Sequence, residues 1–276
     1  MAEVSNNGNG EKTSPAPTAV AGAAAGLKAE IDGSLWKGIV EAISSLVEGE
    51  CVFVADASGM RFRAMDASKV AMISVEIPAS AFDSYTCQGE QRIGVYTDKL
   101  REVMRRCGNE KVQLDLDGEG ARLRIRMKGK TLRTFSLPLI DVSSEALGEP
   151  KIPLKVRATI PSAALMSHVK DAATVGDFLT LRATQDKLEI SASGDKGEVS
   201  ITVTREDDLL TMDLQEESRA NYSLQYLEKM TTLLSENVSL EFATELPMHI
   251  EYDMDKGVKL AYWLAPRVEA EVGGSG

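Results

Sequence analysis

The chain has few residues of the types that build metal sites and nucleophilic active sites. Its 276 residues include two histidines and three cysteines, and neither type falls at the spacing of a zinc site or a catalytic triad. His168 lies in a predicted helix and His249 in a predicted strand, which favours structural or surface roles. The odd number of cysteines is typical of reduced core residues in a cytoplasmic protein. We therefore expect no metal, no cofactor and no enzymatic activity.

Positive charge, aromatic side chains and long apolar runs are also scarce. The net charge of −11 argues against general attraction to phosphates, although a local basic surface can still hold a nucleic acid. Aromatic residues make up 5% of the chain, so the core is predicted to be mostly aliphatic. No run approaches the length of a membrane span, and the N-terminus lacks a signal pattern. These absences predict a cytoplasmic protein without a membrane partner.

The predicted elements follow the same order in both halves of the chain. Helices are predicted to begin at Ser34, Thr97, Ser162 and Ser223, where a capping residue precedes an apolar stripe of helical spacing. The offset between corresponding caps is nearly constant, which indicates an internal duplication. We predict an α+β chain of two similar domains, each with helices on one face of antiparallel sheets. Strands are predicted within 27–31, 51–77, 112–116, 121–127, 131–137, 155–160, 178–183, 187–193, 198–204, 211–214, 238–243, 248–252 and 259–264.

A proline-rich stretch without periodicity separates the two halves. Residues 137–153 carry three prolines and one glycine, and loops of this length are usually functional or linkers. Val142, Leu147 and Ile152 would be unneeded in a plain linker, so a docking loop and a solvated linker both remain open. The predicted division is a disordered tail (1–26), a first domain (27–137), a connector (138–153), a second domain (154–269) and a flexible tail (270–276).

Basic residues lie opposite the apolar stripes of the predicted helices. They are Lys37 on the first helix, Arg101, Arg105 and Arg106 on the second, Lys170 on the third and Lys229 on the fourth. Such a face can hold a polyanion weakly, but basic residues on a helix are ordinarily just solvated, and Glu41 dilutes the pattern. The pattern alone favours the solvated interpretation.

Several short stretches resemble, in the same order along the chain, the DNA sliding clamps of the proliferating-cell-nuclear-antigen type. The resemblance covers 27–269 and looks more archaeal than eukaryotic. It implies the clamp fold, in which three identical subunits close a ring with helices around a central hole and sheets on the outside. The stretches are Met65–Val70, Phe82–Tyr85, Cys107–Glu110, Leu147–Gly148, Ser191–Asp195 and Tyr262–Glu269.

The resemblance also implies a function and two kinds of binding site. A clamp encircles duplex DNA without reading its sequence and tethers DNA polymerase, clamp loader, flap endonuclease and DNA ligase through a short motif of a glutamine, an aliphatic and two aromatics. The DNA-facing residues would be Lys37, Arg101, Arg105 and Lys170. For Met65 and Met72 alone, core packing is the default interpretation. The implied docking groove comprises Met65, Val70, Met72, Leu147, Pro247, Trp263, Ala265 and Pro266.

The subunit seam of such a ring pairs one edge strand from each half across neighbouring subunits. We assign these edges to Ala121–Met127 and Glu198–Thr204. Two alternatives stay open: a subunit of a heterotrimeric clamp, and an enzyme of unrecognised type. The predicted interface residues are Arg122, Arg124, Arg126, Glu198 and Ser200.

Overall fold

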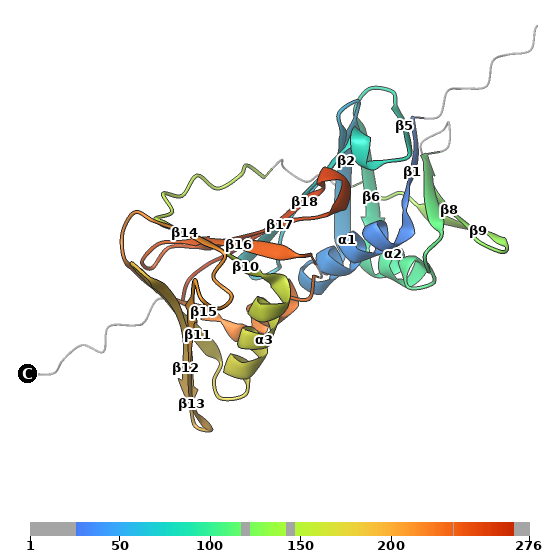
Figure 1. The fold of residues 1–276 in the computed structure, drawn as a ribbon. Coiled ribbons are helices and arrows are strands. Elements are labelled where there is room, and N and C mark those ends of the chain that lie inside the picture. The colour runs from blue at the N-terminus through green and yellow to red at the C-terminus, as the bar shows by residue number, and fades with distance from the viewer. Residues whose placement is uncertain (1–25, 117–121, 142–146, 234, 268–276) are drawn as a thin grey trace, which may run out of the picture.

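The protein consists of two similar domains placed side by side (Figure 1). The computed structural model describes residues 26–116, 122–141, 147–233 and 235–267. Most of the predicted N-terminal tail, the whole C-terminal tail, Val142 and the last two residues of the Tyr262–Glu269 stretch lie outside the described residues.

The first domain contains two α-helices and nine strands in its described part. Helix α1 follows the first strand, and helix α2 follows the sixth. Its elements are β1 (Leu27–Asp32), α1 (Gly33–Leu46), β2 (Glu50–Asp56), β3 (Gly59–Met65), β4 (Ala71–Pro78), a 3₁₀ turn (Ala79–Ala81), β5 (Ser84–Cys87), β6 (Gln91–Tyr96), α2 (Thr97–Met104), β7 (Lys111–Leu116), β8 (Arg122–Lys128) and β9 (Leu132–Pro138).

The second domain repeats this order, element for element, apart from the position of its 3₁₀ turn. The predicted duplication is therefore present in the fold. Its elements are β10 (Val156–Pro161), α3 (Ser162–Ala173), β11 (Phe178–Thr184), β12 (Lys187–Gly194), β13 (Gly197–Thr204), β14 (Thr211–Leu214), β15 (Ser218–Ser223), α4 (Leu224–Met230), β16 (Asn237–Phe242), β17 (Met248–Asp253), a 3₁₀ turn (Asp255–Gly257) and β18 (Lys259–Leu264).

Three antiparallel sheets form the outer layer, and the largest of them crosses the domain boundary. The strand orders are β5-β1-β7-β8-β9, β14-β10-β16-β17-β18-β4-β3-β2-β6 and β13-β12-β11-β15. The nine-stranded sheet joins the domains because β18 pairs with β4, and this register places Trp263 opposite Met72. The domains are thus fused by a strand ladder as well as by the connector.

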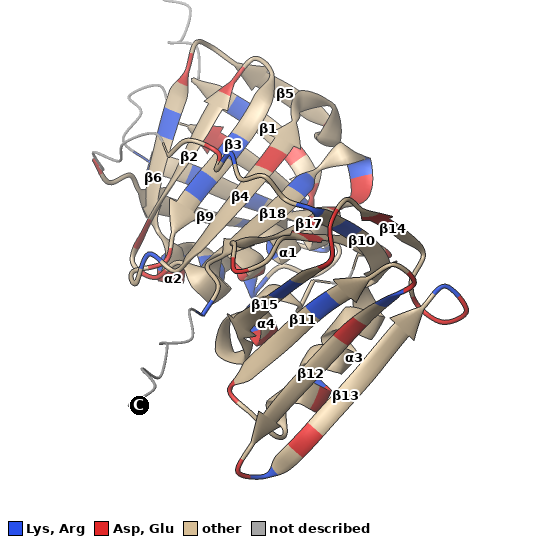
Figure 2. Ribbon diagram, turned by 90° about the vertical axis from the view of Figure 1, so that its left-hand side faces the viewer, with Lys and Arg blue, Asp and Glu red and all other residues tan. Residues whose placement is uncertain are grey.

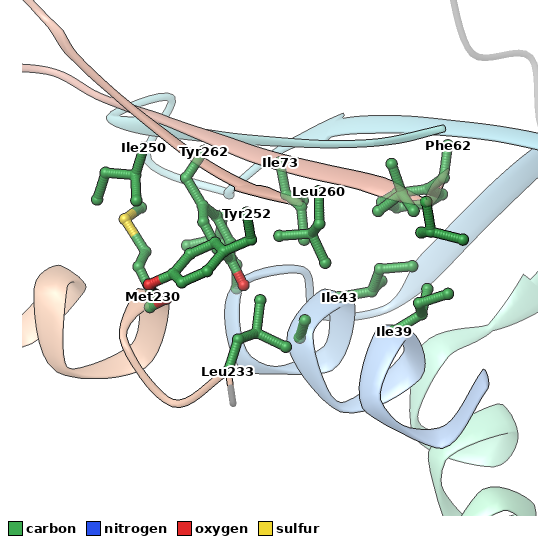
Figure 3. Close-up of a cluster of buried hydrophobic side chains, with 14 of the residues drawn as sticks. Ile39, Ile43, Phe62, Ile73, Met230, Leu233, Ile250, Tyr252, Leu260 and Tyr262 are labelled. Atoms are coloured by element: carbon green, nitrogen blue, oxygen red, sulfur yellow. Dashed lines mark hydrogen bonds between the residues drawn. The ribbon is translucent and has the colours of Figure 1, made fainter. Parts of the chain in front are cut away.

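The four helices form one layer on a single side of the nine-stranded sheet (Figure 1). Helix α1 packs against α2 and α4, and α4 packs against α3. Ile39 and Ile43 of α1 point toward the sheet, where Tyr252 and Tyr262 are buried beside them (Figure 3). Burying an aliphatic side chain of this size contributes about 1.5–3 kcal/mol. Within the described residues, no helix is both long and apolar enough to cross a membrane.

The first helix begins at Gly33, one residue before its predicted cap, Ser34. The cap is Asp32, whose carboxylate accepts hydrogen bonds from the backbone N–H groups of Ser34 (3.0 Å) and Leu35 (3.1 Å), rather than Ser34 itself. The Ser34 hydroxyl also bonds to this carboxylate, and this contact is the main reason why the pKa of Asp32 is lowered. Asp32 therefore satisfies orphan donors of the first turn.

The remaining helix starts and several strands differ in detail from the prediction. Thr97 and Ser162 are the first residues inside α2 and α3, so neither occupies the predicted cap position. Ser223 does occupy the N-cap position of α4, but its side chain makes no capping hydrogen bond. The strands β5, β6 and β15 were not predicted. Their short or polar sequences (SYTC, QRIGVY and SRANYS) lack a sustained apolar alternation.

Candidate docking groove, helix-layer cations and sheet edges

An apolar groove of about 270 Å³ lies where the connector crosses the seam between the domains. One wall comes from the β3–β4 hairpin, a second from the end of β18, and a third from the connector. Met65 and Leu147 at its rim are 37% and 39% exposed, which is unusual for large apolar side chains in this protein. The lining residues are Met65, Lys69, Val70, Ala71, Met72, Leu147, Gly148, Pro150, Ile152, Pro247, Trp263 and Ala265.

The structure brings together seven of the eight residues that were predicted for this groove. Pro266 is not part of the lining. It is followed by Arg267, whose N–H donates to the carbonyl of Asn221 on β15 and whose guanidinium lies over the Phe178 ring. Ile152 was noted in the sequence only as an apolar connector residue, and the fold now places it in the wall.

The β3–β4 turn that carries one wall of the groove is organised around Asp66. This carboxylate accepts hydrogen bonds from the N–H groups of Ser68 (3.1 Å), Val70 (2.8 Å) and Ala71 (2.8 Å). The hydroxyl of Tyr226, which belongs to α4 in the other domain, donates a fourth at 2.6 Å. Burial alone would raise the pKa of Asp66, but these donors outweigh it and the pKa is lowered. The wall is therefore held from both domains.

The floor of the groove is an indole ring fixed by its cross-strand neighbours. Trp263 lies opposite Met72 on one side and His249 on the other. The His249 ring stacks on the indole with centroids 4.4 Å apart, and its Nδ1 lies 3.4 Å from the Glu241 carboxylate. Trp263 is only 8% exposed, so its orientation is set before any ligand arrives.

Three of the four predicted DNA-facing residues lie along the contact between α1 and the end of α2. Lys37 donates to the carbonyl of Cys107 at 3.3 Å, while Arg101 and Arg105 both approach Glu41 on α1, at 2.9 Å and 3.7 Å. Glu41 therefore offsets part of the positive charge of α2. Glu41 was expected only to dilute the basic face, and it is the direct partner of both arginines.

Lys170 occupies the last turn of α3 and is exposed, on the helix layer of the second domain. The helix layer therefore carries all four predicted residues. Clusters of at least three histidine, cysteine, aspartate or glutamate side chains suited to a metal ion are absent from the described part of the chain.

The predicted edge strand of the first domain is not an edge. Strand β8, which contains the Ala121–Met127 prediction except for Ala121, pairs with β7 on one side and with β9 on the other. Arg122 donates to Ser136 on β9, and Arg126 forms an ion pair with Asp115 on β7 at 2.8 Å. The arginines of β8 lie together on its more exposed face, as their alternation predicts. Such alternation does not distinguish an edge strand from an interior one.

On this side the sheet ends in β9, and the four-stranded sheet of the second domain ends in β13. No other described strand pairs with the outer side of either. Glu198 and Ser200 lie exposed on β13, where the prediction placed an edge, whereas Arg124 belongs to the interior strand β8.

Comparison with known proteins agrees with this architecture. The family model for the N-terminal domain of proliferating cell nuclear antigen matches residues 27–145, and the one for its C-terminal domain matches residues 150–267. A DNA polymerase sliding clamp from Pyrococcus abyssi is 35% identical over 234 residues, covering 84% of this chain and 94% of the relative. DNA polymerase sliding clamp 1 from Pyrobaculum aerophilum is 34% identical over 243 residues, covering 87% and 97%.

A solved structure shows the same fold. Proliferating cell nuclear antigen from Thermococcus kodakaraensis superimposes with a TM-score of 0.83 at 25% identity, covering 87% of this chain and all of that chain. Both family models, the curated relatives and the solved structure agree, and the chain belongs to the proliferating cell nuclear antigen family.

Proposed function

We propose that this chain is a sliding clamp, a non-enzymatic ring of three identical subunits that encircles duplex DNA and tethers replication and repair enzymes. In the described part of the chain the three sheets end in six strands: β5, β9, β14, β6, β13 and β15. The observation that carries the proposal is that two of these edges, β9 and β13, hold the places of β18 and β4, which already pair with each other. A head-to-tail ring closes both open edges at once.

The equivalence of β9 and β18 follows from their ladders. In the first domain, Phe135 of β9 lies opposite Ile125 of β8. In the second domain, Tyr262 of β18 lies opposite Ile250 of β17. The two strands thus hold the same place in their domains, and only β18 has a further neighbour. Strand β9 also carries Leu132, which is 64% exposed, the highest exposure among the large apolar side chains that the structure describes.

The intrachain ladder also supplies a register for the seam between subunits. Tyr262 lies opposite Ile73 of β4, and Val199 holds in β13 the position that Ile73 holds in β4, because each lies opposite an alanine of the preceding strand. By the same register, Phe135 of one subunit would face Val199 of the next. Both side chains are half-buried in the isolated chain and would become core residues of the seam.

On the outer side of this seam, a predicted interface arginine would contribute from an interior strand instead of from the edge. Trp263 lies opposite Met72 within the chain, so the matching pair between subunits is Ser136 and Glu198. Arg122 already donates to the Ser136 hydroxyl at 2.7 Å. Arg122 of the interior strand β8 would then reach across β9 toward Glu198 of the neighbouring subunit. The proposed interface thus keeps Glu198 and Ser200 and gains β9.

The helix layer would line the hole and contact DNA at phosphates without reading bases. Lys37, Arg101, Arg105 and Lys170 supply positive charge there, and Glu41 moderates it. Weak contacts suit a ring that must slide, because each fixed phosphate contact adds affinity that would resist movement. The chain would act wherever genomic DNA lies, in the nucleoid region of the cytoplasm for an archaeal-type cell.

The groove between Met65, Leu147 and Trp263 would receive the aromatic anchors of docking motifs from DNA polymerase, clamp loader, flap endonuclease and DNA ligase. Its apolar lining and the Trp263 indole held by its neighbours support this role, since the few residues that dominate binding energy lie in well-packed, desolvated pockets. A closed ring also needs a loader that opens it.

The ring is tested by the mass in solution, measured by light scattering behind size exclusion at several concentrations. A species of three chains is expected at micromolar protein. A strict monomer at high concentration would exclude the homotrimer, and mixing with paralogous chains would then test the heterotrimeric alternative.

The groove is tested with a fluorescent peptide that carries the glutamine, aliphatic and two-aromatic motif. Trp263→Ala should weaken its binding by about 30-fold or more, the range of interface hot spots. Tyr96→Ala removes an exposed aromatic residue outside the groove and should leave binding unchanged. Equal binding by wild type and Trp263→Ala would rule out this groove.

A further inference from the structure

The β8–β9 hairpin ends in an exposed basic tip. Lys128 is the last residue of β8, and Lys130 lies in the turn that leads into β9. Both side chains are exposed, and neither ammonium group has a carboxylate partner among the described residues. Leu132, the first residue of β9, is 64% exposed beside them. The tip therefore presents two unpaired positive charges next to an uncovered apolar side chain.

The carboxylates nearest to this tip are already occupied. Glu110 pairs with Arg133 of β9. Lys111 lies opposite Lys128 on the β7–β8 ladder and pairs with Asp83. These two carboxylates therefore do not offset the charge of the tip.

An acidic turn follows the other open edge, β13. It contains Glu206, Asp207 and Asp208, and it is held to the end of the strand by the Thr204 hydroxyl, which donates to Asp207 at 2.9 Å. Arg205, beside these acids, donates to a backbone carbonyl of β14. Glu206 and Asp208 have no cationic partner in the part of the chain that the structure describes. The turn thus keeps two carboxylates available to a partner.

The register of the proposed seam brings the basic tip to this turn. In that register Phe135 faces Val199 of the next subunit, and paired residues of antiparallel strands advance in opposite directions. Lys130 therefore faces Thr204, as far before Phe135 as Thr204 lies after Val199. The acidic turn begins directly after that position. Lys128 lies one strand behind the edge, a distance of about 4.8 Å that a lysine side chain can span.

Charges then lie at both ends of the seam and not between them. Strand β13 has Glu198 near its start, the acidic turn after its end, and only neutral residues from Val199 to Thr204. Figure 2 shows this strand with charged bands at its two ends and a tan middle. A slip of two residues would displace both charged ends by about 7 Å. Charge contacts at both ends would therefore favour a single register.

We propose that the basic tip of one subunit binds the acidic turn of the next and that this contact makes closure of the seam sensitive to salt. The proposal rests on the ring proposed above and adds a means of regulating it. Each lysine meets a carboxylate in solvent, and an exposed pair of this kind strengthens a contact by about two- to fivefold. The effect is repeated at three seams, and raised salt weakens all of them because exposed charges are screened.

The test measures dissociation of the three-chain species by light scattering over a range of protein concentrations, at about 50 mM and 500 mM salt. Lys128→Glu combined with Lys130→Glu should raise the concentration at which the species dissociates by about tenfold or more at the lower salt, since two pairs are lost at every seam. Glu206→Lys combined with Asp208→Lys should have the same effect. Both differences should shrink at the higher salt.

A fourfold variant separates charge pairing from damage to either loop. The chain that carries all four changes has an acidic tip and a basic turn, so it should dissociate much as wild type does. Lys28→Glu combined with Lys151→Glu is the matched control, because it makes the same change in net charge at two exposed lysines outside the hairpin and β13. This control should also dissociate like wild type.

Subunit exchange between rings labelled with donor and acceptor dyes extends the comparison to concentrations that are too low for light scattering. Equal dissociation and exchange of wild type and both twofold variants would overturn the proposal, and so would a fourfold variant that recovers no stability. A wild-type chain that stays monomeric at every concentration would instead reject the ring itself.

Discussion

The hydrogen bond between Tyr226 and Asp66 makes a quantitative prediction about how the two domains hold the groove. It joins α4 of the second domain to the β3–β4 turn of the first, at 2.6 Å. Tyr226→Phe removes only the hydroxyl, and Asp66 keeps its three backbone donors. Bonds to charged groups contribute about 1.5–3 kcal/mol, and Tyr226 is only partly buried, so we expect a loss of about 1.5 kcal/mol in the free energy of unfolding.

The same variant has a pH signature. The pKa of folded Asp66 is lowered, so its ionised form stabilises the fold above the unfolded pKa, and this stabilisation is lost as pH falls through the folded pKa. Removing the tyrosine donor moves the folded pKa back toward the unfolded one. The difference between wild type and Tyr226→Phe should therefore be largest near pH 7 and shrink in acid.

Urea unfolding at pH 7 and near pH 3, at one fixed protein concentration, measures both quantities. Tyr252→Phe is the matched control, because the Tyr252 hydroxyl donates to the neutral carbonyl of Met230 at the end of α4. Its cost should not change between the two pH values. A Tyr226→Phe cost below about 0.3 kcal/mol, or one equal at both pH values, would refute a charge-assisted bond of this size.

Three further variants test other parts of the structure. Glu41→Gln should release the two α2 arginines, raise the affinity for short duplex DNA by about two- to fivefold at low salt and steepen its salt dependence in an anisotropy assay; unchanged affinity would contradict the role of Glu41. Phe135→Asp should convert the three-chain species to monomers in light scattering, whereas Arg126→Gln, whose arginine pairs with Asp115 in its own chain, should leave the mass unchanged. Asp32→Ala should cost about 1 kcal/mol in urea unfolding at neutral pH and less in acid, because the lowered pKa of Asp32 makes its stabilisation disappear as pH falls; an equal cost at both pH values would contradict the capping role.

Much of the fold was predictable because helical and alternating patterns are local. The apolar stripe from Leu35 to Leu46 is buried in α1 as predicted, and the duplication follows from the spacing of helix starts. Errors arose where two residues compete for one role, as Asp32 and Ser34 do at the first cap. Strands such as β15 were missed because SRANYS has almost no apolar side chains, so only pairing with β11 makes it a strand.

The groove and the edges depended on long-range pairing, which a local pattern does not contain. Residues such as Met65 and Trp263 were placed together by family resemblance, and the structure shows the physical reason: β18 pairs with β4. The edge was misassigned because the alternation of β8 is stronger than that of β9, although β9 lies outermost. The contact between Tyr226 and Asp66 spans 160 residues and had no sequence signal.

The ladder between β4 and β18 changes what the connector has to do. Six residue pairs cross from one domain to the other in this ladder, and Ala265 adds a backbone bond to Val70. Covalent continuity through residues 138–153 is then unnecessary for keeping the domains in place. A chain nicked there by a protease should still migrate as one particle under native conditions and separate into two fragments only in denaturant. The strands beneath the connector, rather than the connector itself, therefore preserve the geometry of the molecule.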